Sequence, residues 1–111
     1  MAARVDAGGA AGKIQLLDST DTLLVEIPCA YPVPAAVNGK VDFLGGSASI
    51  GSASAGGTVD RFKVVTSADT EVFVGAAGSV TEIGGGGDIE LQKLAVVAGQ
   101  KIRLTSFEHG E

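Results

Sequence analysis

The chain is poor in the residues on which many catalytic and metal sites depend. Its 111 residues include one cysteine, one histidine and no tryptophan. A lone Cys29 excludes a disulfide within the chain, and no set of cysteines and histidines has the spacing of a zinc site. We expect Cys29 to be a small buried apolar residue of a protein made in a reducing cytoplasm. A reactive thiol and a bridge between chains remain the alternatives.

Positive charge and long apolar runs are also scarce. Eight basic residues face thirteen acidic ones, so the net charge is −5, which repels the phosphate backbone of a nucleic acid. No stretch approaches the roughly 18 apolar residues of a membrane span. The N-terminal segment lacks the apolar run of a signal peptide. We therefore expect a soluble protein without a nucleic-acid or membrane partner.

Helical periodicity is the next thing that the sequence lacks. No window of about eleven residues keeps an apolar stripe at a 3.6-residue period, and at most one helical turn fits at residues 91–100. Apolar residues instead alternate with polar ones in short runs separated by turn residues. The runs lie at residues 13–19, 22–28, 41–46, 58–67, 70–75, 79–83, 88–92 and 100–107.

This pattern predicts seven to nine short strands and an all-β fold. Strands at about ten-residue spacing with glycine-rich turns are typical of an antiparallel β-sandwich, and we expect a jelly-roll-like one. The first two runs should form a hairpin, and in the run at 70–75 Val72 and Val74 should share one face. Residues 1–12 are small and glycine-dotted and predict a flexible N-terminal arm, which leaves residues 13–111 as the sandwich domain.

The segment "GGSASIGSASAGGT" at residues 45–58 is built almost entirely from small residues. Its "SASI" part alternates in step with the neighbouring runs, which predicts a strand at 47–50 and a loop at 51–57. Serine, alanine and glycine on a pleated strand let another backbone or a neighbouring subunit approach closely.

The motifs in this sequence that resemble catalytic or ligand-binding motifs are incomplete. "GGAAGKI" at residues 8–14 lacks the glycine spacing of a phosphate loop and has Ile14 where a magnesium-binding hydroxyl is needed. "GGGGD" at 84–88 is expected to be a flexible hairpin loop, and His109, three residues from the C-terminal end, to be solvated. Aspartates fall at predicted turns, where they bond to backbone: Asp18, Asp21, Asp42, Asp60, Asp69 and Asp88. We expect neither an enzyme nor a cofactor or metal site.

A candidate docking surface is "AYPVP" at residues 30–34. Two prolines restrict the backbone around Tyr31 and Val33, so that little conformational entropy would be lost on binding. Alternatively, Tyr31 covers one end of the sandwich.

Three segments in order resemble the small capsid decoration proteins of tailed bacteriophages, also called cement or staple proteins. The segments are "TLLVEI" at 22–27, the stretch at 38–65, and "GGDIELQKLAVVAGQKIRLTSF" at 86–107. The closing block of the family pattern is matched by Asp88, Ile89, Leu91, Ala98, Gly99, Ile102, Leu104, Thr105, Ser106 and Phe107, with Gln100 in place of a second glycine.

The resemblance implies a jelly-roll-like structural protein on the outer surface of the virion capsid. It implies a homodimer that bridges subunits of the major capsid protein and has no small-molecule substrate. The expected capsid-contact residues are Ala2, Arg4 and Val5 in the arm and Tyr31 and Val33 beyond it. The alternative function is a ligand-binding sandwich, such as a sugar-binding or tail-associated host-recognition module.

Overall fold

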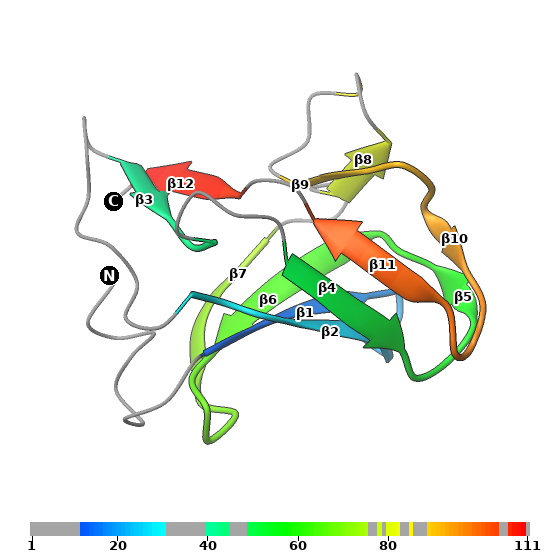
Figure 1. The fold of residues 1–111 in the computed structure, drawn as a ribbon, viewed down its shortest axis with the longest axis horizontal. Coiled ribbons are helices and arrows are strands. Elements are labelled where there is room, and N and C mark those ends of the chain that lie inside the picture. Colours follow the sequence, from blue (N-terminus) through cyan, green and yellow to red (C-terminus); the bar gives the residue numbers. More distant parts are fainter. Residues whose placement is uncertain are drawn as a thin grey trace.

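The computed structural model describes residues 12–30, 40–44, 49–75, 78, 80–82, 85, 89–104 and 107–110. These residues form strands, turns and bends and no helix, which confirms the predicted all-β class (Figure 1). The strands are β1 (Lys13–Leu17), β2 (Leu23–Pro28), β3 (Lys40–Asp42), β4 (Ser49–Ala53), β5 (Gly57–Thr58), β6 (Arg61–Val65), β7 (Glu71–Val74), β8 (Val80–Glu82), β9 (Ile89–Leu91), β10 (Ala95–Val96), β11 (Lys101–Leu104) and β12 (Glu108–Gly110).

Six of the strands form one antiparallel sheet in the order β11-β4-β2-β1-β6-β7. The hairpin predicted from the first two runs is present, with Ile14 opposite Ile27 and Leu16 opposite Val25. Three two-stranded sheets, β3–β12, β8–β9 and β5–β10, lie at the upper left, upper right and right of the large sheet in Figure 1. Nine strands at most were predicted and twelve are present; the three additional ones, β5, β10 and β12, all belong to these small sheets.

One hydrophobic cluster connects the large sheet to the small ones. Aliphatic side chains dominate it, and Val80, Ile89 and Val96 of the small sheets belong to the same cluster as Ile14 and Leu16. Three phenylalanines lie at its centre. The ring of Phe107 stacks on Phe43 at 5.0 Å and meets Phe62 edge-on at 5.2 Å, and all three are at most 1% exposed. Edge-on and offset rings add to the stability that burial alone provides.

The β1–β2 and β6–β7 hairpins are two copies of one structure, 48 positions apart. Their turns are "DSTDT" at 18–22 and "TSADT" at 66–70. Asp18 N donates to Thr22 O at 3.1 Å, and Thr66 N donates to Thr70 O at 2.9 Å. The fourth residue of each turn has a positive φ, 66° for Asp21 and 65° for Asp69.

The same correspondence holds beyond the turns. The β1–β2 register shifts between Leu16 and Leu17, and the β6–β7 register shifts between Val64 and Val65. Because β1 and β6 pair antiparallel around the Gln15–Lys63 pair, an approximate two-fold axis relates the two hairpins and places their turns at opposite ends of the paired strands. The sequence pattern had not revealed this repeat.

Ion pairs follow the same two-fold relation. Lys13 of β1 contacts Asp69 in the turn of the other hairpin, with 2.7 Å between Nζ and Oδ1. Arg61 of β6 contacts Asp21, with 3.3 Å between a guanidinium nitrogen and Oδ1. Each hairpin therefore supplies the cation that pairs with the positive-φ aspartate in the turn of the other hairpin.

The small-residue segment differs from its prediction. Residues 47 and 48 lie outside the described residues, Ser49 and Ile50 are in a strand as expected, and β4 continues through residues 51–53, which were predicted to be loop. A Cβ added to Gly51 would collide with the carbonyl oxygen of Glu26 and lie 2.8 Å from Cγ1 of Ile27. The small residues thus allow β4 to approach β2 closely, as expected of such a segment.

The "GGGGD" segment is not a hairpin loop, because β8 and β9 on either side of it pair in parallel. Of residues 83–88 the structure describes Gly85, whose amide donates to Glu82 O at 2.9 Å. A Cβ at Gly85 would lie 2.7 Å from Cβ of Thr81, so this tight turn needs glycine.

Residues 91–100 contain no helical turn, within the expected limit of at most one; the end of β9 is followed by a bend, by β10 and by a tight turn at 98–99. One further prediction is wrong. Val74 does not share a buried face with Val72, because the register shift in β7 places Val74 opposite Lys63, where its side chain is 46% exposed. A bulge of this kind reverses the alternation that sequence reasoning assumes.

The segment around His109 is not a free tail. Its backbone forms β12, in which His109 pairs with Val41 of β3. The side chain of His109 lies outside the described ones, so the expected solvation of its imidazole stays a prediction.

Candidate functional site

The five predicted capsid-contact residues lie outside the described residues. Ala2, Arg4 and Val5 belong to residues 1–11, and Tyr31 and Val33 belong to residues 31–39. Their contact role therefore remains a prediction. The described neighbour of the second group is Ala30, whose amide donates to Phe43 O at 2.8 Å.

A pocket of about 140 Å³ lies where the segment after β9 meets β11. Its lining consists of Gln92, Lys93, Gln100, Lys101, Ile102 and Arg103. The pocket thus gathers three of the chain's eight basic residues and two amide side chains, and its lining contains no acidic residue.

The alternation of β11 sets the orientation of this lining. Ile102 and Leu104 are buried in the core, so Lys101 and Arg103 project to the other side and are exposed. Lys101 Nζ reaches Ser52 Oγ of the neighbouring strand at 3.4 Å. Before β11, the chain turns at Gly99, whose φ of +86° suits glycine.

Gln100 links this turn to the pocket. Its backbone amide donates to Val97 O at 3.0 Å, and its side-chain oxygen accepts from Val97 N at 3.0 Å. The turn that leads into β11 is therefore held by two hydrogen bonds at the pocket wall.

The three cations of the pocket form no ion pair with a carboxylate of the described residues. No carboxylate of the described residues lies within 4 Å of Lys93, Lys101 or Arg103, whereas Lys13 and Arg61 are both ion-paired. Three such cations attract an anion and repel a metal ion. The described residues also contain no group of three or more potential metal ligands.

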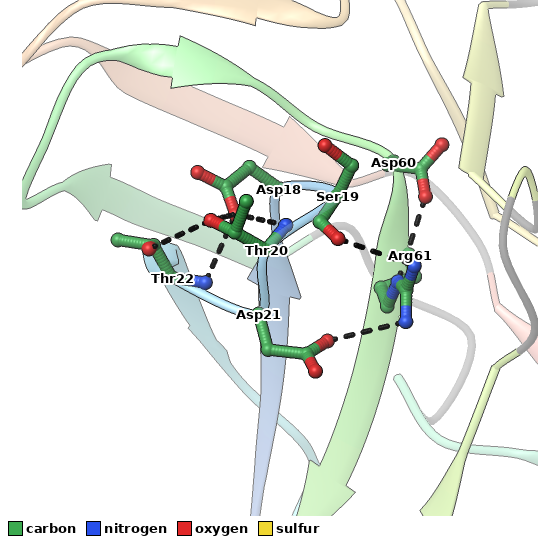
Figure 2. Close-up of polar contacts among 7 residues, drawn as sticks. All are labelled: Asp18, Ser19, Thr20, Asp21, Thr22, Asp60 and Arg61. Carbon is green, nitrogen blue, oxygen red and sulfur yellow. Dashed lines mark hydrogen bonds and ion pairs between the residues drawn. The ribbon is translucent and has the colours of Figure 1, made fainter.

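The densest polar cluster of the described residues serves a structural purpose instead. Figure 2 shows Arg61 reaching from β6 to Asp21, to the carbonyl of Ser19 at 3.4 Å and to Asp60, whose Oδ2 lies 3.5 Å from Nε. The Asp60 contact is an ion pair without hydrogen-bond geometry, because Nε has no hydrogen-bond partner. These contacts tie the first turn to β6 and leave Arg61 engaged within the protein.

Asp18 organises the same turn (Figure 2). Its Oδ1 accepts from the hydroxyl of Thr20 at 2.7 Å and from the amides of Thr20 and Thr22 at 2.8 and 3.0 Å. The hydroxyl bond, followed by the Thr22 amide, lowers the pKa of Asp18 below its ordinary value. At the opposite turn, the hydrogen bond to Asp69 raises the pKa of Lys13.

Other predicted site features have structural positions. Cys29 is 6% exposed and packs in the hydrophobic cluster, which confirms the expected small buried residue. Phe43, Phe62 and Phe107 are core residues, so these rings offer no exposed platform for stacking a sugar. Since the described part of the chain has no helix, it has no helix long and apolar enough to cross a membrane.

Sequence reasoning did not identify the basic pocket. One local signal was present, because Lys101 and Arg103 occupy alternate positions of a predicted strand and must share a face. The approach of Gln92 and Lys93 depends on how the β9–β10 segment packs beside β11, which alternation does not specify. Comparison with protein-family models, with curated proteins and with solved structures gives no match for this chain.

Proposed function

We propose that the protein is a capsid decoration protein of a tailed bacteriophage. It binds the outer surface of the head as a homodimer and bridges subunits of the major capsid protein. Its fold is then a jelly-roll-like sandwich, in which the small sheets supply the layer that packs on the six-stranded sheet. The single core cluster that joins Val80, Ile89 and Val96 to the large sheet supports this arrangement.

The observation that carries the proposal is the place of the closing block in the fold. Its five large apolar members, Ile89, Leu91, Ile102, Leu104 and Phe107, are buried in the core, while the small Ala98 is exposed. Gly99 of the block occupies a turn with positive φ immediately before β11. Six of the ten letters of the block are therefore core or turn positions of a packed β structure.

A decoration protein also needs rigid domains and many weak contacts. Repetition over an icosahedral lattice multiplies modest contacts into strong retention, since a subunit that detaches at one point stays close to its site. A small β domain with tight turns and a three-phenylalanine centre provides the rigid part. Contacts of mixed polar and apolar character would be weakened only partly by moderate salt.

The direct test is to mix the purified protein with heads of its own virus assembled without it. The proposal expects saturable binding with a fixed number of copies per head, measured by cosedimentation and located by electron microscopy. A protein that stays in the supernatant at every ratio would exclude this function.

The expected role of the arm can be tested with the same heads. Deletion of residues 1–12 should leave the domain folded, with a circular dichroism spectrum like that of the full chain, and reduce head binding. Binding equal to that of the full chain would show that Ala2, Arg4 and Val5 are not contact residues.

A further inference from the structure

We infer that the basic pocket is a docking site for an acidic, extended segment of a partner protein. The segment lies along the outer edge of β11, and its carboxylates pair with Lys93, Lys101 and Arg103. The identity of the partner, a capsid subunit, rests on the proposed function; the chemistry of the site does not.

The position of β11 leaves one side of this strand open to a partner. It is the terminal strand of the six-stranded sheet and pairs with β4 on one side. In the described part of the chain its other side has no strand partner in that sheet, and a terminal strand presents unpaired N–H and C=O groups to an incoming chain.

The lining of the pocket includes a continuous part of the chain that leads into β11. Residues 100–103 are four consecutive lining residues. Successive side chains of a strand point to opposite faces, so a pocket on one face would be lined by alternate residues. Lining by consecutive residues fits a pocket that opens at the edge of the strand, and this is where we place the partner's main chain.

The positive charge of the pocket contrasts with the negative charge of the whole chain. The chain carries −5 overall, so its average field repels acidic partners. Lys93, Lys101 and Arg103 are nevertheless gathered in one place, exposed and without an ion pair to any described carboxylate. Their charge is therefore available to neutralise an acidic segment and to select it from other surfaces.

The volume of the pocket and the spacing of its basic residues suit an extended segment better than a small molecule. A volume of about 140 Å³ is smaller than the roughly 300–1,000 Å³ that hold a typical small-molecule ligand. It suits one or two side chains of a segment whose remainder lies outside. Lys101 and Arg103 are two residues apart on a strand, about 7 Å along the chain, which matches alternate residues of an extended partner. Gln92 and Gln100 supply amide donors and acceptors at the rim.

The binding experiment uses the full chain labelled with nitrogen-15 and two short probe peptides. One peptide alternates glutamate and threonine, and the other has glutamine in place of glutamate. Binding of the glutamate peptide should shift the amide signals of residues 92–93 and 100–103, and the glutamine peptide should bind about tenfold more weakly. Raising the salt from about 0.05 to about 0.5 M should weaken the glutamate complex several-fold.

Matched single variants locate the site. Lys101→Gln and Arg103→Gln should each weaken the glutamate peptide about three- to tenfold. Lys63→Gln changes the net charge equally but lies on β6, away from the pocket lining, and should change binding less than twofold. Proton spectra of all three variants should retain the dispersion of the wild type.

Several results would overturn the inference. They are equal binding of the two peptides, equal losses for Lys63→Gln and Arg103→Gln, signal shifts centred away from β11, or tighter binding of a single-stranded oligonucleotide of the same charge. The two proposals fail separately. Peptide binding without head binding rejects the decoration function, whereas head binding that Arg103→Gln leaves intact, without peptide binding, rejects the docking site.

Discussion

Two different side chains perform the same task in the two related turns. Asp18 accepts from the amides of Thr20 and Thr22, and Thr66 Oγ1 accepts from the amides of Ala68 and Thr70, both at 3.2 Å. What the first position of the turn requires is a short side chain with an oxygen acceptor. Carboxylates and hydroxyls meet this requirement equally, because both reach the amides two and four residues ahead.

Thr66 is buried and its hydroxyl accepts two hydrogen bonds, so removing that hydroxyl should destabilise the protein. We expect Thr66→Val to lower the free energy of unfolding by about 1–2 kcal/mol, because two amides lose their acceptor in a partly buried turn. The measurement is urea denaturation followed by circular dichroism. Thr66→Ser keeps the oxygen and should recover most of the loss; equal losses in both variants would contradict this account.

Asp18 gives a prediction about pH. Its folded pKa lies below the ordinary value of 3.8, chiefly because of the Thr20 hydroxyl. The stability that ionised Asp18 contributes is therefore complete above the unfolded pKa and is lost as the pH falls through the folded one. Asp18→Thr, which copies the other turn, has an acceptor that does not titrate. Going from about pH 5 to about pH 2, the urea midpoint of the wild type should fall relative to that of Asp18→Thr. A constant difference would contradict the assignment.

At the scale of the elements, the approximate two-fold relation between hairpins is the main organising feature. β1 and β6 pair around Gln15 and Lys63, and the two bulges and two ion pairs follow the same relation. The symmetry ends at the outer strands. β2 pairs with a further strand, β4, through Val25 and Glu26, whereas β7 is the last strand of the sheet. The difference lies partly in β4, whose small residues fit closely against β2.

Gly51 should be the least replaceable of the small residues in β4. In Gly51→Ala the new methyl group would overlap the backbone of Glu26, which cannot move without breaking the β2–β4 pairing. We expect a loss of about 2–4 kcal/mol in the free energy of unfolding. Gly56→Ala is the matched control, because its added Cβ would lie no closer than 3.4 Å to Val96 O, and it should change stability by less than about 0.5 kcal/mol. Thermal and urea unfolding of both variants would test the contrast.

At the scale of the whole molecule, Phe107 joins parts that are distant in sequence. Its ring contacts Phe43, which follows β3, and Phe62 of β6, and its carbonyl accepts from the amide of Phe43 at 3.0 Å. This one residue therefore connects the chain's last described segment to the large sheet and to the turn after β3. The closing block of the sequence therefore contributes a ring that packs between two parts of the core.

Truncation of Phe107 should affect the whole domain. We expect Phe107→Ala to reduce the free energy of unfolding by about 3–5 kcal/mol, because it leaves a cavity between two other rings. Val97→Ala, at a side chain that is 68% exposed, should change it by less than about 0.5 kcal/mol. A loss confined to β12, detected as rapid hydrogen exchange there with an unchanged global midpoint, would show that Phe107 anchors only the last strand.

The repeating alternation of apolar and polar residues determined the all-β class, the β1–β2 hairpin and the burial of residues such as Ile14, Leu104 and Phe62, because a strand has a period of two wherever it pairs. Tertiary structure alone decided which strands are neighbours, that β8 and β9 run parallel, and that bulges bury Leu24 and expose Val74. It also brought Lys93 beside Lys101 and Arg103 to form the basic pocket. These features depend on contacts between residues that are distant in the sequence. The alternation of apolar and polar residues indicates which face of a strand a side chain occupies, but not which residues it contacts.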